Sequence, residues 1–160
     1  MNLRNSSPTD VPFLEEMLFE AFFWNETTER PAFEEFRKHE AFAKLLAGWG
    51  RFGDRAVVAE DQGTLIGAAW FRLWMPELHS YGFIDVTTPE LAIAIAAGYR
   101  RKTIGRALLE ELIATARADG FAALSLSVSP LNPARHLYES LGFQKVGETG
   151  SSWTFRLALG

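Results

Sequence analysis

An apolar segment that leads through a basic turn into a helix constrains this chain more than any other feature. Residues 90–96 read ELAIAIA, which is typical of a strand, and residues 103–118 carry the apolar stripe of an amphipathic helix. Arg100, Arg101 and Lys102 lie between them. A helix start presents unpaired backbone N–H groups and the positive end of the helix dipole. We therefore expect an α/β fold with a phosphate-binding site at this turn.

Hydrophobic periodicity along the rest of the chain predicts a mixed sheet with helices on its faces. The predicted order is β α α β β β α β α β β, within one domain that spans residues 1–160. The expected strands are 3–5, 55–60, 64–74, 90–96, 122–129, 143–147 and 152–159. The expected helices are 11–23, a second that starts at Pro31 and keeps its apolar face to Leu46, 103–118, and a last one from Asn132–Pro133 to Gly142.

Two of the expected strands have one bulky face and one small face. Residues 91–96 alternate Leu or Ile with Ala, and residues 124–129 alternate Leu or Val with Ser. A central strand that is covered on both sides usually carries bulky residues on both. Two interpretations stay open: helices pack closely over the small residues, or the strands leave room between them for a ligand.

Composition excludes several classes of function. The chain has no cysteine, which rules out disulfides, a thiol nucleophile and thiolate metal sites, and no spacing of His, Asp and Glu suggests a metal centre. A net charge of −4 argues against a nucleic-acid-binding protein. No segment approaches the roughly 20 apolar residues of a membrane span, and the N-terminus lacks the apolar core of a signal peptide. The expected location is the cytoplasm.

The segment 90–143 resembles the GNAT superfamily of acyl-CoA-dependent N-acyltransferases. Its basic turn is similar to the pyrophosphate-binding signature of that family, which reads Arg or Gln, two residues, Gly, one residue, then Gly or Ala. Arg100 and Gly105 match the first and last places, and Thr103 stands where the first glycine is expected. Residues 132–143, NPARHLYESLGF, resemble the later CoA-binding motif of the family at nearly every informative place.

The resemblance implies a splayed sheet with acetyl-CoA between strands 90–96 and 122–129. It implies backbone bonds from Ile93, Ala94 and Ile95 to the pantetheine arm, and contacts of Asn132 and Tyr138 with the cofactor. The pyrophosphate would be held by Arg100 and by backbone N–H groups of Arg101, Lys102, Thr103, Ile104, Gly105 and Arg106.

Acyl transfer from a thioester to an amine requires an acid for the leaving thiolate. A phenol, with a pKa of about 10, is protonated at neutral pH and can donate to a thiolate. Tyr138 stands where the family commonly places this acid. The alternative is that Tyr138 is a core aromatic residue, because it shares an apolar stripe with Ala134, Leu137 and Leu141.

The amine must lose a proton, and Glu90, at the start of the strand beside the proposed thioester, is the first candidate for the base. Asp85 is the second, and a chain of waters is the third. Each carboxylate has the alternative of being an exposed strand end or loop residue. The backbone N–H of Ile95 is the expected donor to the oxyanion.

The leading hypothesis is an N-acetyltransferase that moves acetyl from acetyl-CoA to a primary amine by direct attack in a ternary complex. The acceptor would be a small amine or a peptide amine, and homodimers are common in such families. A non-catalytic acyl-CoA-binding sensor is the alternative from another class. Loop aromatics are expected to wall the acceptor site or to pack as ordinary core, and His79 to border that site; the aromatics are Phe22, Phe23, Trp24, Trp74, Tyr81 and Phe83.

Overall fold

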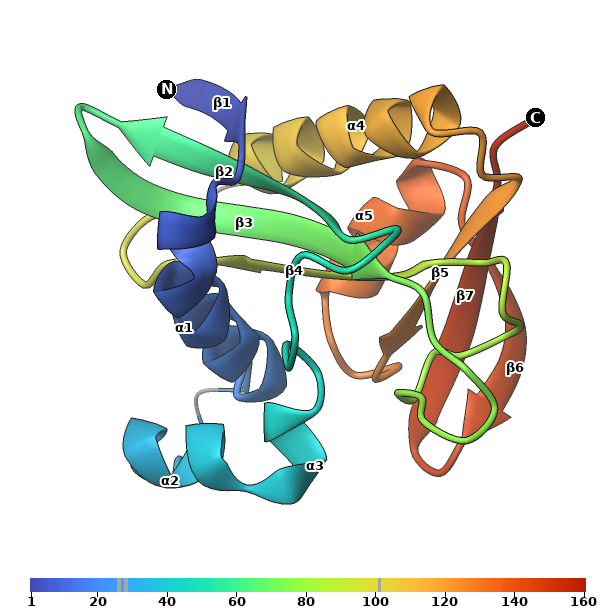
Figure 1. Cartoon of the computed structure of the whole chain (residues 1–160), viewed down its shortest axis with the longest axis horizontal. Coiled ribbons are helices and arrows are strands. Elements are labelled where there is room, and N and C mark those ends of the chain that lie inside the picture. Colours follow the sequence, from blue (N-terminus) through green and yellow to red (C-terminus); the bar gives the residue numbers. More distant parts are fainter. Residues whose placement is uncertain (26, 28, 101) are drawn as a thin grey trace.

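The computed structural model describes residues 1–25, 27, 29–100 and 102–160, and Figure 1 shows their arrangement. Seven strands form one mixed sheet in the order β1-β2-β3-β4-β5-β7-β6 in this described part of the chain. The strands are β1 (Asn2–Asn5), β2 (Arg55–Asp61), β3 (Thr64–Arg72), β4 (Glu90–Ile95), β5 (Ala123–Val128), β6 (Gln144–Thr149) and β7 (Ser152–Ala158). The helices are the 3-10 turn η1 (Pro8–Asp10), α1 (Val11–Phe22), α2 (Phe33–Lys38), α3 (Glu40–Ala43), α4 (Lys102–Ala118) and α5 (Ala134–Ser140).

The predicted fold class, a mixed sheet flanked by helices, is confirmed. Turn residues explain several boundaries: Gln62 and Gly63 both have positive φ values, 51° and 82°, as a tight β2–β3 hairpin requires. Gly120 and Gly142 follow α4 and α5 with φ values of 87° and 103°. A residue without a Cβ takes up this left-handed conformation at the end of a helix at little cost.

The prediction of one helix from Pro31 to Leu46 is wrong. The chain forms α2 and α3, separated at His39, whose backbone is extended (φ −69°, ψ 131°). The His39 Nδ1 atom accepts a hydrogen bond from the Ala41 N–H at 3.1 Å and so caps α3. The break also lets the rings of Phe36 and Phe42 stack with their centroids 4.4 Å apart. Six residues apart on a continuous helix, these rings would point in different directions.

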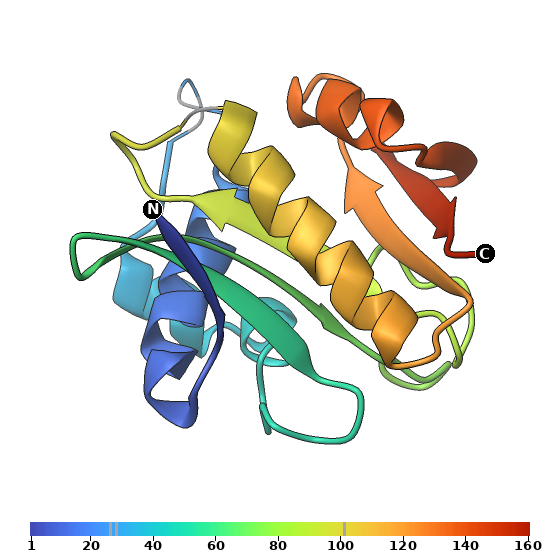
Figure 2. The same ribbon diagram turned by 90° about the horizontal axis from the view of Figure 1, so that it is seen from above.

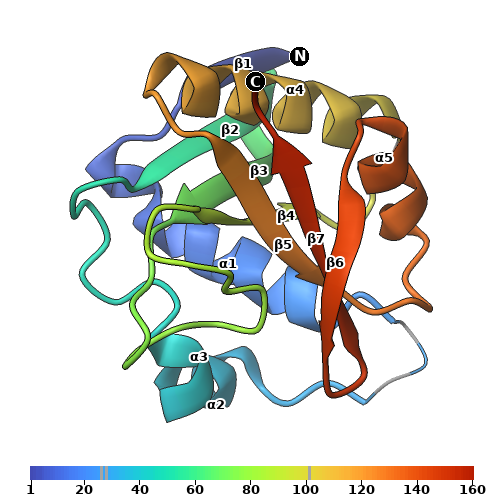
Figure 3. The same ribbon diagram turned by 90° about the vertical axis from the view of Figure 1, so that its right-hand side faces the viewer.

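The sheet consists of two antiparallel halves that meet between β4 and β5. The first half runs β1-β2-β3-β4, and the second runs β5-β7-β6. Among the described residues the two parallel neighbours β4 and β5 share one register position, Glu90 opposite Ser125. Figures 2 and 3 show the second half turned away from the first, with α4 lying mainly over the first half. The sheet is therefore splayed at its centre.

Each face of the sheet has its own core. On the face covered by α4 and α5, the core includes Leu91, Ile93 and Ile95. On the other face, covered by α1 and the short helices, the core includes the alanines of β4, Ala92 and Ala94. The small face of β4 thus lies against α1, as the close-packing interpretation expects. The splay next to the same strand also leaves space, so the two interpretations are compatible.

The described residues contain neither a membrane-spanning helix nor a cluster of metal ligands. Every helix in this part of the chain is too short or too polar to span a lipid bilayer. The same residues contain no group of three or more His, Asp or Glu side chains arranged to hold a metal ion.

Candidate active site

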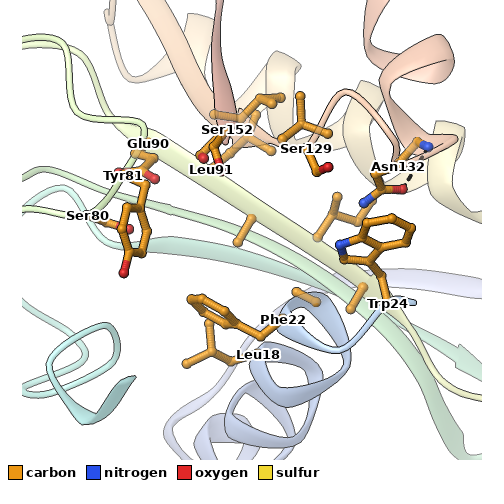
Figure 4. A pocket seen from close by; sticks show the side chains of 18 of the residues that line it. Leu18, Phe22, Trp24, Ser80, Tyr81, Glu90, Leu91, Ser129, Asn132 and Ser152 are labelled. Atoms are coloured by element: carbon orange, nitrogen blue, oxygen red, sulfur yellow. Dashed lines mark hydrogen bonds between the residues drawn. The ribbon is translucent and has the colours of Figure 1, made fainter. Parts of the chain in front are cut away.

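A large cavity opens where the sheet splays, and Figure 4 shows part of its lining. Its volume is about 960 Å³, at the upper end of the range typical of small-molecule sites. Its walls come from the C-terminal end of α1, from α3, β3, β4, β5 and α5, and from the hairpin between β6 and β7. The cavity thus passes from one face of the sheet to the other between its two halves.

The predicted pantetheine-binding residues line this cavity. Ile93, Ala94 and Ile95 lie on β4 beyond the point where that strand pairs with β5. Their other edge is occupied by β3, with Ile93 opposite Ala69. Backbone N–H and C=O groups on the edge that faces β5 are therefore available to an extended ligand, which would take the place of a neighbouring strand.

The basic turn lies at one end of the cavity. Arg100 lines the cavity, and its guanidinium is held by the Glu20 carboxylate of α1 at 2.6 Å and by the Ile95 carbonyl at 3.5 Å. Arg101 lies outside the described residues. Lys102 is the first residue of α4. A phosphate group that binds Arg100 would share this arginine with Glu20 or displace the carboxylate.

In the first turn of α4, some residues can contribute only backbone groups to a ligand because their side chains are used elsewhere. Thr103 is exposed, whereas the side chain of Ile104 is buried in the core, so only the backbone N–H of Ile104 can serve an anion. Gly105 lines the cavity, and a Cβ built there would lie 3.3 Å from Leu137 of α5. The absence of a side chain at Gly105 therefore lets α4 and α5 approach closely.

Arg106 points to α5 instead of the cavity. Its guanidinium donates to the Ser140 hydroxyl at 2.7 Å and lies 3.7 Å from the Glu110 carboxylate. Its side chain joins the two helices at the surface, and only its backbone N–H remains for the role that the sequence predicts.

Asn132 and Tyr138 both line the cavity from the opposite wall. The Asn132 Oδ1 atom accepts a hydrogen bond at 3.0 Å from the N–H of Ala134, the first residue of α5, which leaves the Asn132 amide nitrogen for a ligand. Tyr138 is buried, and its ring makes edge contacts with Phe143 and Phe155. Its hydroxyl makes no hydrogen bond to another described residue. Tyr138 is therefore both a core aromatic and a lining residue, and burial raises the pKa of its phenol.

Glu90 has the most perturbed carboxylate of the cavity. Burial raises its pKa to about 7, although the Gly82 N–H, the Ser80 side chain and the charge of Lys44 act in the opposite direction. The Gly82 N–H donates to Oε2 at 3.0 Å, while Oε1 is buried with no partner among the described residues. A carboxyl group near its midpoint at neutral pH can both accept and release a proton.

Gly82 fits against Glu90 so closely that no larger residue can replace it without movement. A Cβ built on Gly82 would lie 2.8 Å from the Glu90 Oε2 atom and 2.8 Å from the backbone of β5 at Leu126 and Ser127. The loop before β4 therefore presses onto the splay point and holds the carboxylate there. The sequence shows this glycine only as one breaker in an irregular loop, so its role was not predictable.

The other candidates near Glu90 have different surroundings. Burial alone would raise the pKa of Asp85, but hydrogen bonds from Thr87 and Thr88 outweigh it and lower the pKa. Asp85 thus ties its own turn together and does not line the cavity. The ring of His79 stacks on Phe83 with the centroids 4.6 Å apart, and His79 is also absent from the lining.

Aromatic residues form the wall on the α1 face of the cavity. Four of the loop aromatics singled out in the sequence line it: Phe22, Trp24, Trp74 and Tyr81. Phe23 and Phe83 lie elsewhere, packed against Phe19 and His79. Sequence reasoning missed other lining residues on this face, among them Leu18, Phe42, Leu45, Trp70 and Arg72. Arg72 could have been noticed in the sequence, because it is a lone charged residue in an otherwise apolar strand.

Comparison with known proteins now decides the family. The sequence model of the acetyltransferase (GNAT) family matches residues 13–143. The chain belongs to the GNAT acetyltransferase family. N-acetyltransferase family 8 member 3 of Mus musculus is 35% identical over 101 residues, which are 62% of this chain and 43% of the mouse protein. The chain therefore spans less than half the length of this curated relative.

Solved structures of other GNAT proteins share the fold. A ribosomal-protein-alanine N-acetyltransferase from Brucella melitensis superimposes with a TM-score of 0.71 at 24% identity, over 99% of both chains. A phosphinothricin acetyltransferase from Sinorhizobium meliloti in complex with acetyl-CoA gives 0.70 at 23% identity, over 99% of this chain and 88% of that one. These likenesses support the splayed GNAT sheet and carry no information about the acceptor.

In this GNAT protein the structure gathers most of the predicted site residues around one cavity. Its lining includes Glu90, Ile93, Ala94, Ile95, Arg100, Gly105, Asn132 and Tyr138. Thr103, Ile104 and Arg106 are outside the lining, although they belong to the same helix start. The two predicted catalytic candidates, the phenol of Tyr138 on α5 and the carboxyl group of Glu90 on β4, thus line the same cavity.

Proposed function

We propose that the protein is an N-acetyltransferase that transfers acetyl from acetyl-CoA to a primary amine by direct attack in a ternary complex. The observation that carries this proposal is the placement of Glu90 on β4 and Tyr138 on α5 around one cavity at the splay of the sheet. Family membership supports the reaction class. The geometry of the cavity supports an extended donor beside β4 and an acceptor on the α1 face.

The donor would lie along the edge of β4 that faces β5. The backbone of Ile93, Ala94 and Ile95 would bond its pantetheine arm, and the amide nitrogen of Asn132 would reach it from α5. The pyrophosphate would lie at the start of α4, where backbone N–H groups of residues 102–106 and the guanidinium of Arg100 meet the positive end of the helix dipole. Arg101 is proposed for this set on sequence alone.

The proposed reaction forms one bond from the amine nitrogen to the acetyl carbon and breaks the bond from that carbon to sulfur. An ammonium acceptor gives one proton to Glu90, directly or through water, and the neutral amine attacks the carbonyl. The nitrogen then loses its second proton to water, and the departing thiolate takes a proton from Tyr138. Glu90 afterwards releases its proton to solvent, and the tyrosinate regains one from water. The products are the acetamide and CoA thiol, with one proton released to solvent.

The environments of the two groups fit these roles. Glu90, with a pKa of about 7, is ionised in part at neutral pH and can accept a proton. Tyr138 keeps its proton at neutral pH because burial raises the pKa of its phenol, and a thiol with a pKa of about 8.5 leaves a thiolate that needs one. The backbone N–H of Ile95 is proposed to donate to the oxyanion.

The first experiment is calorimetric titration of the protein with acetyl-CoA, with adenosine diphosphate as the control ligand. We expect acetyl-CoA to bind at micromolar concentrations and adenosine diphosphate to bind much more weakly, because the pantetheine arm contacts β4. Release of CoA is then followed with a panel of primary amines. Binding without release from any amine would favour the acyl-CoA sensor, and no binding at all would reject both functions.

A further inference from the structure

The proposed acceptor site has an unusual balance of apolar surface and charge, and the inference drawn from it rests on the proposed function. We infer that the acceptor is a primary amine attached to an aromatic or similarly bulky apolar group, with no carboxylate and no second cationic group. Three observations support this acceptor: the apolar wall of the cavity, the pairing of the charges along it, and the position of Glu90.

The wall on the α1 face of the cavity is apolar and rich in aromatic rings. It comes from α1, α3 and the turn after it, β3, and the loop before β4, and its residues are Leu18, Phe22, Phe42, Leu45, Trp70, Trp74 and Tyr81. Figure 4 shows Phe22 and Leu18 rising from α1 toward β4, with Tyr81 on the same side as Glu90. Tyr81 is also 53% exposed, so it marks the rim of this recess. A flat apolar group is the natural occupant of such a wall.

The charged side chains of the lining are nearly all neutralised by partners. Among the described lining residues they are Glu20, Arg72, Glu90 and Arg100. Glu20 binds the guanidinium groups of Arg30 and Arg100. Glu90 is the one member of this described set that has no ion pair, although the charge of Lys44 acts on it from outside the lining. A single unpaired carboxylate complements a single ammonium, and additional charges on an acceptor would enter the recess uncompensated.

The guanidinium of Arg72 lies near the proposed amine site, where it could in principle bind a carboxylate on the acceptor. Its Nε and Nη2 atoms donate to both oxygens of Asp54 at 2.9 and 3.0 Å, and Nη1 donates to the Leu45 carbonyl at 3.0 Å. The guanidinium also lies against Trp49 and Trp74, 5.4 and 5.6 Å from their ring centroids. Arg72 is 1% exposed and its charge is balanced by Asp54. It is therefore not available to bind the carboxylate of an amino-acid acceptor.

The position of Glu90 sets the direction of the acceptor. Glu90 on β4 is opposite Arg72 on β3, and the next pair on the same face is Ala92 opposite Trp70. Tyr81 directly precedes Gly82, whose N–H holds the Glu90 carboxylate. An ammonium at Glu90 would therefore place its substituent among these aromatic side chains, and the rings would also favour the cation itself.

The test compares kcat/KM for matched amines with saturating acetyl-CoA at one pH. The reference is 2-phenylethylamine. Phenylalanine adds a carboxylate to it, n-propylamine has a methyl group in place of the ring, and spermidine carries further cationic groups and no ring. We expect 2-phenylethylamine to exceed each of the other three by at least tenfold. Phenylalanine, n-propylamine or spermidine at an equal or higher kcat/KM would overturn the inference and leave the proposed function in place.

A pair of variants on α1 and its end tests the aromatic wall itself. Phe22 lines the cavity, whereas the adjacent Phe23 packs against Phe19 and Phe36 outside it. We expect Phe22→Leu to lower kcat/KM for 2-phenylethylamine at least fivefold and to leave that for n-propylamine within twofold. Phe23→Leu should leave the ratio of the two amines unchanged. An unchanged ratio in the Phe22→Leu enzyme, or an equal change in both variants, would contradict the proposed acceptor.

The same assays separate the two levels of the proposal. If the protein binds acetyl-CoA and acetylates none of the four amines, the inference about the acceptor fails. If it also fails to acetylate a wider panel of amino acids, polyamines and peptide amines, the proposed transfer reaction fails with it.

Discussion

Glu90 and Asp85 lie only five positions apart in the sequence, yet their surroundings shift their pKa values in opposite directions. Asp85 accepts hydrogen bonds from two threonines of its own turn, which keep its pKa low. Glu90 is half-buried at the splay point, with one carboxylate oxygen buried and lacking a described partner, and its pKa rises to about 7. The sequence placed both near the site but could not rank them by environment, because the ranking depends on which one the loop at Gly82 covers.

Replacing Glu90 with Gln is expected to change the pH dependence of catalysis. For the wild-type protein, kcat/KM should rise with pH up to about 7, as the carboxyl group ionises, and then level off. The Glu90→Gln enzyme should lose at least tenfold in kcat/KM at pH 8 and show no inflection near 7. Steady-state kinetics from pH 5.5 to 9 measure this, and an unchanged profile would point to water as the base.

The same variant should reveal the cost of the buried charge. The pKa of Glu90 is raised from 4.5 to about 7 in the folded protein, so folding is favoured while the group is protonated. That contribution is lost as the pH rises from about 4.5 through 7, and it amounts to about 3 kcal/mol. Relative to Glu90→Gln, the wild type should therefore lose about 2 to 3 kcal/mol in free energy of unfolding between pH 5 and 8.5. Urea titrations at both pH values test this.

Replacing Tyr138 with Phe removes the proposed acid and keeps the ring contacts with Phe143 and Phe155. We expect kcat to fall by about 100-fold, within the range for loss of a general acid, while the Kd for acetyl-CoA changes less than threefold. Calorimetry and CoA-release kinetics on the same preparation give both values. Turnover equal to that of the wild type would leave Tyr138 as a core residue only.

Among the elements, the segment between α3 and β2 owes its position to one buried ion pair. Asp54 near its end and Arg72 at the end of β3 are both almost fully buried and form two parallel hydrogen bonds. The same guanidinium holds the Leu45 carbonyl, and Leu45 lines the cavity. This pair therefore fixes part of the acceptor wall to the sheet.

Removal of one partner of that pair should be costly. We expect Arg72→Ala to lower the free energy of unfolding by about 3 to 5 kcal/mol, because it leaves the Asp54 carboxylate buried without its partner. The control is Arg55→Ala, which breaks a surface pair with Asp119 and should cost no more than about 1 kcal/mol. Equal losses in the two variants would show that the buried pair has no special role.

Most elements were predictable from local patterns, and the exceptions have physical reasons. The hairpin at Gln62–Gly63 and the ends of α4 and α5 follow from turn and capping residues, which act over short distances. The predicted helix through His39 failed because its apolar spacing is satisfied equally by two short helices. Their rings stack through a contact between Phe36 and Phe42 that periodicity alone does not represent.

For the whole molecule, the proposed cofactor side of the cavity was predictable and the proposed acceptor side was not. The cofactor side depends on contiguous motifs at 90–105 and 132–143, which carry the resemblance. The acceptor wall combines residues of α1, α3 and β3 that are distant in sequence and read individually as core. Only the folded arrangement brings Leu18, Leu45 and Trp70 to the same surface.

Binding of the donor should stabilise the whole molecule. A ligand that binds only the folded state at 100 times its Kd contributes about 2.7 kcal/mol. For a chain of this size, that corresponds to a rise in Tm of about 5 to 10 °C. Scanning calorimetry with acetyl-CoA tests this, with adenosine diphosphate at the same concentration as the control. A rise of the same size with both ligands would place the binding energy in the nucleotide and not in the contacts along β4.

The meeting of the two half-sheets at Glu90 and Ser125 has a consequence for motion. If one half rotates relative to the other, displacement grows with distance from this junction, so the rim near the start of α4 travels furthest while the junction itself stays nearly still. The proposed base sits on that axis. A cleft of this design can widen for a bulky donor and narrow again without disturbing the carboxyl group that handles the proton.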